Sequence, residues 1–95
     1  MRRRAKVDVN QPEIVAALRR VGASVVDLSA VGGGCPDIQA GYKGVNYNIE
    51  IKNGGAQKSD RVLTKAQIDF HRDWRGQICV VENVAEALAV IGVTI

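Results

Sequence analysis

The sequence predicts a single α/β domain built on a mixed β-sheet, with its elements in the order α-β-β-β-α-β-α. Three observations support this fold class. The 95 residues suffice for one domain with one hydrophobic core. The 14 valines and 8 isoleucines, against 4 leucines, favour strands over a helical bundle. Three capping residues, each followed three positions later by an acid or an amide, stand before apolar runs and indicate three helices.

Each predicted helix begins after one of these pairs, which are Asn10 with Glu13, Thr64 with Gln67, and Asn83 with Glu86. The helices are expected at about residues 11–21, 65–75 and 84–91, and Gly76 ends the second one. Apolar side chains recur at helical spacing in each: Ile14, Val15, Leu18 and Val21 in the first, Ala66, Phe70 and Trp74 in the second, and Val84, Leu88 and Ile91 in the third.

Four runs are expected to form strands, at residues 24–28, 38–42, 47–51 and 77–81, the last of them central in the sheet. The two middle runs alternate apolar and polar side chains, and Lys43 and Gly44 stand where a hairpin turn is needed. This turn pairs apolar residues with apolar residues: Ile38 with Ile49, Ala40 with Tyr47, and Tyr42 with Val45. A register slipped by one residue is the alternative, although it turns the apolar side chains to the wrong face.

The same register brings three charged side chains together on the polar face of the hairpin. Asp37 stands opposite Glu50, and Lys52 follows Glu50 by two residues and projects from the same face. Two neighbouring carboxylates repel unless a proton or a cation lies between them, and Mg²⁺ binds through one or two carboxylates while keeping several waters. A nearby lysine suits phosphodiester hydrolysis, since it can orient or deprotonate a water. The alternative is a surface cluster of ordinary salt bridges.

A glycine-rich loop at residues 32–34 leads through Pro36 into Asp37. The loop lacks the pattern of a phosphate-binding P-loop and does not open a helix. It is either a flexible turn or a segment that lets a phosphate backbone approach the carboxylates closely.

These residues carry a resemblance to a known family. The sequence GCPD at residues 34–37, followed by IEIK at residues 49–52, resembles the PD-(D/E)xK nuclease pattern. The upstream helical acid Glu13 and the downstream helical amide Gln67 complete it. The order of elements is similar to that of stand-alone virus-type replication-repair nuclease (VRR-NUC) domains, and the resemblance covers about residues 8–91.

The resemblance implies a role for each matched residue. Asp37 and Glu50 would bind the catalytic Mg²⁺, for which Mn²⁺ is expected to substitute, and the Ile51 carbonyl would add a ligand. Lys52 would position or activate the attacking water. Two further residues would assist: Glu13, through metal-bound water or a second ion, and Gln67, by steadying Lys52 or the substrate phosphate. The last two also hold the third position of a capping pair, so a purely structural role is the alternative for both.

The positive charge is concentrated in two segments outside this motif. Residues 1–7 form a basic arm ahead of the single nuclease domain at residues 8–95, with its charge on Arg2, Arg3, Arg4 and Lys6. The segment from residue 53 to residue 65 carries Lys58, Arg61 and Lys65. Each segment is either a solvated stretch or a contact to the DNA backbone, and Gly33 and Gly34 join the expected DNA contacts.

The remaining candidates for chemistry are few. Cys35 and Cys79 are far apart and have no spacing for a zinc site, and Cys79 lies in an apolar run that is expected to be buried. His71 is expected to be a surface or interface residue instead of a catalytic base. No run is long enough to span a membrane, so the expected location is the cytoplasm of a bacterium or of a phage-infected host.

The predicted function is therefore Mg²⁺-dependent endonucleolytic hydrolysis of structured or branched DNA, in viral replication and repair. Family members without further domains form homodimers that resolve four-way (Holliday) junctions, and the resemblance implies the same here. Two alternatives are an inactive nuclease-fold module that only binds DNA and a small α/β protein whose acidic face binds a partner or a metal without catalysis. The sequence leaves open whether the nucleic acid is DNA or RNA.

Overall fold

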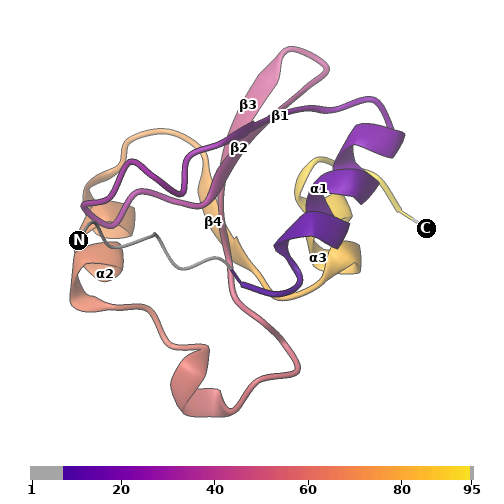
Figure 1. Cartoon of the computed structure of the whole chain (residues 1–95). Helices are drawn as coiled ribbons and strands as arrows, with labels where there is room; N and C mark the ends of the chain where they lie inside the picture. The colour runs from indigo at the N-terminus through magenta and orange to yellow at the C-terminus, as the bar shows by residue number, and fades with distance from the viewer. Residues whose placement is uncertain (1–7, 95) are drawn as a thin grey trace.

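A computed structural model of the chain describes residues 8–94 (Figure 1), so the predicted basic arm lies outside the described residues. The elements are α1 (Gln11–Arg20), β1 (Ser24–Asp27), β2 (Ile38–Tyr42), β3 (Val45–Ile51), the short 3-10 helix η1 (Lys58–Asp60), α2 (Lys65–Asp73), β4 (Ile78–Val81) and α3 (Val84–Val90). The predicted α/β class and mixed sheet are confirmed, whereas η1 was not predicted. None of the helices in this part of the chain is long and apolar enough to cross a membrane.

The sheet has four strands in the order β1-β2-β3-β4, in which only the last pair is parallel. The predicted hairpin register is confirmed, because Ile38 pairs with Ile49 and Ala40 with Tyr47. Lys43 and Gly44 both have positive φ, 50° and 81°, as a two-residue turn between twisted strands requires. The hydrophobic pattern thus sets the register even though lysine is not a favoured turn residue.

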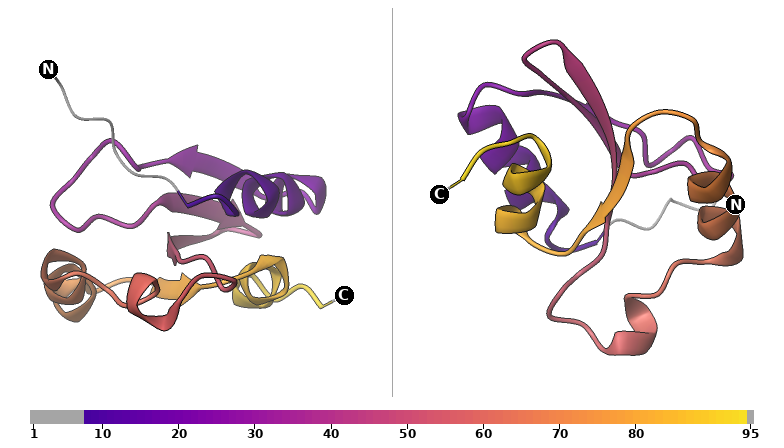
Figure 2. Two further views of the ribbon diagram at one scale, coloured as in Figure 1. Left: turned by 60° about the horizontal axis from the view of Figure 1, so that its bottom comes forward. Right: turned by 180° about the vertical axis from the view of Figure 1, so that it is seen from behind.

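The molecule has three layers. Helices α1 and α3 lie side by side against one face of the sheet, and α2 lies on the opposite side (Figures 1 and 2). The core fills the space between the sheet and the α1/α3 pair, and its large buried side chains include Ile14, Leu18, Ile38, Ile49, Ile51, Val81 and Leu88. The polar residues that alternate with these in β2 and β3 therefore face α2.

Strand β4 lies at an edge of the sheet, so the prediction that residues 77–81 form a central strand is wrong. The apolar character of the run has another cause. Val81 is buried in the core and Cys79 packs against it, whereas Val80 remains 40% exposed on the other face. Cys79 is half-buried. The apolar run therefore reflects the burial of one face of β4 against the core, and does not require a strand on each side of it.

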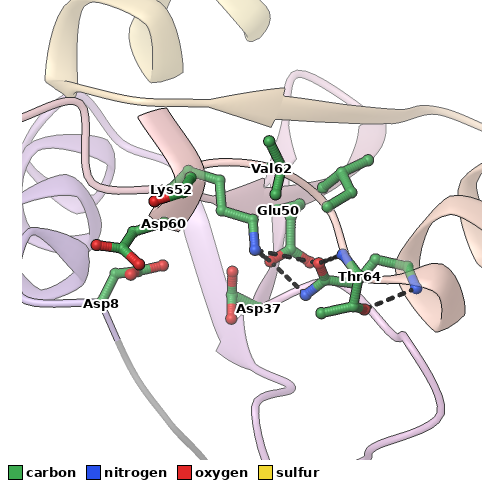
Figure 3. Close-up of a pocket in the computed structure, with 10 residues that line it drawn as sticks. Asp8, Asp37, Glu50, Lys52, Asp60, Val62 and Thr64 are labelled. Carbon is green, nitrogen blue, oxygen red and sulfur yellow. Dashed lines mark hydrogen bonds and ion pairs between the residues drawn. The ribbon is translucent and has the colours of Figure 1, made fainter. Parts of the chain in front are cut away.

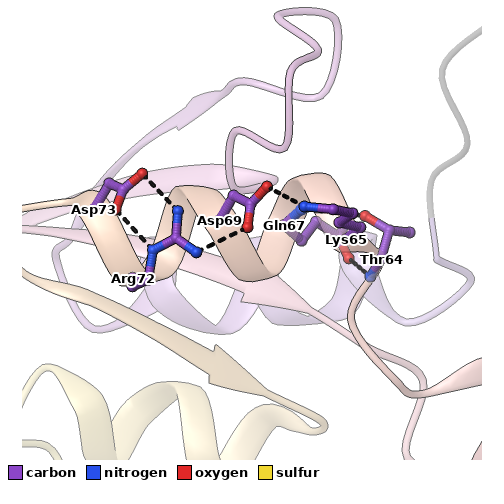
Figure 4. Close-up of polar contacts among 6 residues, drawn as sticks. All are labelled: Thr64, Lys65, Gln67, Asp69, Arg72 and Asp73. Carbon is purple, nitrogen blue, oxygen red and sulfur yellow. Dashed lines mark hydrogen bonds and ion pairs between the residues drawn. The ribbon is translucent and has the colours of Figure 1, made fainter.

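Helix α2 contributes no buried residue to the core. The predicted capping pair at its start is confirmed. The Thr64 hydroxyl accepts a hydrogen bond from the backbone N–H of Gln67, and the Gln67 side-chain oxygen accepts one from the backbone N–H of Thr64. Along its outer side, Asp69 receives hydrogen bonds from Lys65 at 3.0 Å and from Arg72 at 3.1 Å (Figure 4). Local contacts therefore hold this helix together.

The other two predicted capping pairs differ from expectation. Asn83 accepts from the Glu86 amide, but the Glu86 carboxylate turns to the Glu82 amide instead. Asn10 makes no cap at all. Its side chain is buried and donates to the carbonyl oxygens of Lys52 at 3.2 Å and Glu82 at 3.0 Å. Asn10 thereby ties the start of α1 to the segments that follow β3 and β4.

Candidate active site

A cleft of about 390 Å³ lies beside the end of β3 (Figure 3). It is enclosed by β3, the start of α2, the segment that contains η1, and the residues ahead of α1. Its lining residues are Asp8, Asp37, Glu50, Lys52, Ser59, Asp60, Val62, Leu63, Thr64 and Gln67. The cleft therefore contains four of the residues that the sequence pattern singled out, Asp37, Glu50, Lys52 and Gln67.

Glu50 and Lys52 enter the cleft because strand geometry sends alternate side chains to opposite faces. Their neighbours Ile49 and Ile51 point into the core and are fully buried. Glu50 and Lys52 are themselves almost inaccessible, at 2% and 8% exposure. A carboxylate and an ammonium group at such depth are costly unless each has partners.

Asp37 is the last residue before β2, one step beyond the pair Ile38 and Ile49, so the hairpin register brings it next to Glu50. Its carboxylate accepts a hydrogen bond from the Ile51 amide at 2.6 Å, and its own carbonyl accepts from Leu28 at 2.8 Å. Asp37 is therefore attached to both neighbouring strands. The resemblance implies that the carbonyl oxygen of Ile51 is a metal ligand. The contact that Ile51 makes with Asp37 in this structure is through its backbone N–H instead.

Gln67 connects the two buried charges. Its side-chain nitrogen Nε2 donates to Oε2 of Glu50 at 3.1 Å, and its side-chain oxygen Oε1 accepts from Nζ of Lys52 at 3.1 Å. The same Oε1 accepts from the Thr64 amide at 2.9 Å, which completes the helix cap. Capping and contact with the site were alternatives for Gln67 in the sequence, and the structure combines them in one side chain.

Burial raises the pKa of Glu50 to about 8, and the charge of Asp37 and a hydrogen bond with it act in the same direction, with a smaller contribution from the charge of Asp8. Lys52 opposes this rise. Oε1 of Glu50 is buried and has no hydrogen-bond partner among the described residues. A cation or a proton beside this oxygen would relieve both the repulsion and the unsatisfied acceptor.

Two carboxylates in the cleft were not predicted from the sequence. Asp8 and Asp60 lie together at the end of the cleft away from Thr64, with Asp37 between (Figure 3). Glu13, the upstream acid that the resemblance marks, is exposed on α1 and does not line the cleft. Asp8 reaches the cleft because Asn10, two residues later, is bonded to the Lys52 carbonyl. No short-range pattern signals such a long-range contact.

The predicted DNA-contacting lysines and arginines differ in their availability. Lys58 on η1 is exposed. Arg61 is half-buried and forms an ion pair with Glu82 at 3.1 Å, and Lys65 forms one with Asp69 at 3.0 Å. None of the three lines the cleft, although the intervening residues 59–60 and 62–64 do. The segment therefore borders the cleft, with Lys58 as its most available cation.

The glycine loop packs against the start of α2. Gly34 has a φ of +83°, and a Cβ atom there would lie 2.2 Å from the Ala66 carbonyl oxygen. Gly33 also has positive φ, +66°, but open space around it. The absence of a side chain at Gly34 thus lets its backbone lie close to the first turn of α2.

Cys35 and His71 lie near the cleft without lining it. Cys35 is half-buried, and its thiol pKa is raised by burial and by the charges of Glu50 and Asp37. His71 is half-buried too, and burial together with the charge of Lys52 lowers its pKa. Its Nε2 is buried and has no hydrogen-bond partner among residues 8–94. Neither residue contacts the carboxylates through a hydrogen bond.

Within residues 8–94, no three histidine, cysteine, aspartate or glutamate side chains are grouped so as to hold a metal ion. The adjacent carboxyl groups of Asp37 and Glu50 in the cleft could contribute ligands to a metal ion, and carboxylates together with water are ligands that Mg²⁺ accepts. Comparison of the chain with family models, with curated proteins and with solved structures found no match.

Proposed function

We propose that this chain is a Mg²⁺-dependent endodeoxyribonuclease of the PD-(D/E)xK type, similar to stand-alone VRR-NUC domains. The observation that carries the proposal is the joint burial of Glu50 and Lys52 in one cleft with Asp37, with Gln67 bonded to both of the buried groups. A surface cluster of salt bridges would be solvated, whereas these charges are held out of water. Buried, strongly perturbed groups in a cleft are typical of catalytic sites.

The residues fit a hard divalent cation. Glu50 has an unpaired buried oxygen, and Asp37 raises the pKa of Glu50 by repulsion. These two carboxylates would hold the ion, and Mn²⁺ is expected to substitute for Mg²⁺. A bound Mg²⁺ supplies charge stabilisation for a phosphoryl oxygen and lowers the pKa of a coordinated water.

Lys52 is the proposed catalytic residue that orients the attacking water or stabilises the negative charge on the phosphate. Its Nζ is held by Gln67 at 3.1 Å and lies 3.7 Å from Glu50. Gln67 is then a positioning residue, because it limits the directions in which the lysine can point. The helix cap fixes Gln67 in turn through Thr64.

The proposed substrate is structured or branched DNA, such as a four-way junction processed in viral replication and repair. Two incisions are needed to resolve a junction, and each chain supplies one cleft of this composition, so we propose that a homodimer acts. The basic arm and Lys58 would contact the DNA backbone without reading its sequence.

The test is a nicking assay on supercoiled plasmid and on a synthetic four-way junction, in Mg²⁺, in Mn²⁺ and in EDTA. We expect cleavage with either metal and none in EDTA, and its loss in Asp37→Asn and Lys52→Ala. Asp27→Asn is the matched control, since it removes an exposed carboxylate on β1 and should cleave normally. Binding of the junction without cleavage under any of these conditions would favour the inactive DNA-binding module instead.

Metal binding can be measured separately from cleavage. Mg²⁺ that binds only the folded protein raises its melting temperature by mass action. Wild type and Asp27→Asn should both show this rise, and Asp37→Asn should lose it. An equal rise in Asp37→Asn would place the metal elsewhere.

A further inference from the structure

Two aromatic side chains at the C-terminal end of α2 stack on each other outside the core: Phe70 lies on the helix and Trp74 is the residue that follows it. The rings of Phe70 and Trp74 have centroids 5.4 Å apart and planes inclined by 14°. The backbone amide of Trp74 donates to the Phe70 carbonyl at 3.0 Å, which keeps the two residues together at the end of the helix. Phe70 is half-buried, and Trp74 stays 44% exposed even with Phe70 against one face of its indole. The pair thus presents part of a flat aromatic surface to solvent.

This surface belongs to a shallow pocket of about 430 Å³. Besides the two aromatic residues, it is lined by Gly33, Ala66, Asp69 and Asp73. Arg72 binds both of these carboxylates, at 3.1 Å to Asp69 and at 2.9 Å and 3.0 Å to Asp73 (Figure 4). Lys65 adds a second positive charge, at 3.0 Å from Asp69. The two acids are therefore matched by two cations, and they still offer acceptor oxygens around a flat apolar surface.

A nucleobase matches both features of this pocket. Its faces stack on aromatic side chains whatever its identity. The edges of adenine, cytosine and guanine carry amino groups, and carboxylates accept hydrogen bonds from such groups. The other strongly exposed apolar side chains of the sheet and of α2 include Val26, Val80 and Ile68, which are aliphatic and offer no ring.

The pocket adjoins the candidate active site. Gly33 lines the pocket, while Gly34 packs directly on the first turn of α2 and Asp37 follows three residues later in the cleft. Gln67 reaches the cleft from the same helix turn that carries Ala66 into the pocket. A strand with its phosphate at the carboxylates could therefore place a neighbouring base against Trp74.

We propose that Phe70 and Trp74 form a stacking site for an unpaired base of the DNA substrate, beside the phosphate that is cleaved. This inference deepens the proposed nuclease function and rests on it for the identity of the substrate. It narrows the substrate class to branched DNA with an unpaired or displaced base near the incision. Bases inside a continuous duplex are already stacked on their neighbours and cannot use the site.

The chain contains one tryptophan and two tyrosines, so emission excited at a wavelength that only tryptophan absorbs reports on this site. The wild-type protein is titrated in EDTA with a single-stranded oligonucleotide, with a blunt duplex of the same sequence, and with a strand of abasic sites. We expect quenching by the single strand and little by the other two. Equal quenching by the abasic strand, or no quenching by any DNA, would overturn the proposal.

Affinity is then measured by anisotropy with a labelled substrate that carries an unpaired flap. Trp74→Ala should weaken binding by about tenfold, a change of about 1.4 kcal/mol, and Trp74→Phe should retain most of it. Ile68→Ala is the matched control, since it removes a 51% exposed side chain from the same helix outside the pocket. A loss in Ile68→Ala equal to that in Trp74→Ala would refute the site, provided that both variants melt like wild type.

Three further outcomes separate this proposal from its rivals. Fluorescence that changes with protein concentration in the absence of DNA, together with a dimer that Trp74→Ala abolishes, would make the pocket a subunit interface and refute base stacking. Cleavage of branched DNA with no change in Trp74 emission would refute stacking and leave the nuclease function intact. Quenching by single strands in a protein that never cleaves would refute the nuclease function alone.

Discussion

Nζ of Lys52 lies 3.7 Å from Oε2 of Glu50, and only 10% and 3% of the two side chains are exposed. Lys52 counteracts the two largest influences that suppress the ionisation of Glu50. Burial and the charge of Asp37 push Glu50 toward the neutral acid, whereas Lys52 favours the carboxylate. The site is therefore sensitive to anything that changes the positive charge near Glu50, including a metal ion, a proton or the loss of the lysine.

The first prediction concerns the stability of the metal-free protein against pH. The pKa of Glu50 is raised from 4.5 to about 8 on folding, so the folded state holds a proton that the unfolded state releases. The extra proton on Glu50 therefore stabilises the folded state. This contribution to the free energy of unfolding is complete below about pH 4.5 and is lost as the pH rises through about 8. We expect the free energy of unfolding to fall by a few kcal/mol between these limits, on the order of the pKa difference times 1.36 kcal/mol.

Urea unfolding in EDTA at pH 5 and at pH 8.5 measures this loss. In Glu50→Gln the side chain at this position is neutral at both pH values. This variant should therefore lose most of the difference in the free energy of unfolding between pH 5 and pH 8.5. Glu86→Gln, a change of the same kind at an exposed residue that does not line the cleft, should leave the difference in place. A pH dependence unaltered by Glu50→Gln would mean that Glu50 is not the group that binds the extra proton.

The second prediction compares how the loss of a positive charge at Lys52 and the loss of a negative charge at Asp37 affect DNA binding and cleavage. Lys52 attracts phosphate, whereas Asp37 repels it until a metal is bound. In EDTA, Lys52→Ala should weaken junction binding by less than about tenfold, or 1.4 kcal/mol, and Asp37→Asn should bind as tightly as wild type or more so. Both should lose single-turnover cleavage in Mg²⁺ by orders of magnitude. Cleavage by Lys52→Ala at close to the wild-type rate would refute the mechanism.

The third prediction uses two glycines with the same backbone conformation and different surroundings. Gly32 and Gly34 have φ of +80° and +83°, but a Cβ atom meets nothing within 4 Å at Gly32 and lies 2.2 Å from the Ala66 carbonyl at Gly34. Gly32→Ala should cost about 1 kcal/mol from its backbone conformation. Gly34→Ala should cost more and should also reduce cleavage, since α2 and Asp37 must shift. Equal costs in chemical denaturation would argue against a tight contact.

The fourth prediction concerns the buried side chain of Asn10. Asn10→Ala leaves the carbonyl oxygens of Lys52 and Glu82 without their donors, which should cost about 1–3 kcal/mol. The folded variant should also cleave more slowly than wild type, because Asn10 no longer holds the backbone of Lys52. Asn83→Ala removes only a helix cap, so it should cost about 1 kcal/mol and leave the cleavage rate of the folded protein unchanged.

The fifth prediction concerns the salt dependence of DNA binding. Each phosphate contact contributes about 0.9 to the slope of log K against log salt. Lys58→Ala, or deletion of residues 1–6, should flatten the slope. Arg61→Ala should change it less, because Glu82 already pairs with Arg61, and should instead loosen the segment that borders the cleft. Slopes identical to wild type in the first two variants would mean that those charges only solvate the protein.

Much of the fold followed from short-range pattern. The alternation in β2 and β3 predicted the hairpin register, and that register alone brought Asp37, Glu50 and Lys52 to one face. Helix positions followed from capping residues and apolar spacing. These features are local, since they depend on residues within one turn or one hairpin, and a single sequence contains them in full.

Other features depended on contacts between distant parts of the chain. Asn10 looks like a helix cap, yet it binds the Lys52 and Glu82 carbonyls. Asp8 consequently lines the cleft, whereas Glu13 does not. The run at residues 77–81 looks central and lies at an edge. In each case the side chain or strand has two physically acceptable environments, and local sequence does not distinguish them.

The sequence by itself thus determined the class of the fold, the hairpin and the three charges that the hairpin aligns. Only the tertiary structure decided how deeply those charges are buried, that Gln67 bridges Glu50 and Lys52, and that Phe70 and Trp74 remain outside the core. The physical reason is that strand alternation fixes the face on which a side chain lies, while its solvation depends on which other segment covers that face. Here the covering segments are the one that contains η1 and the start of α2, which packs closely against Gly34 through Ala66.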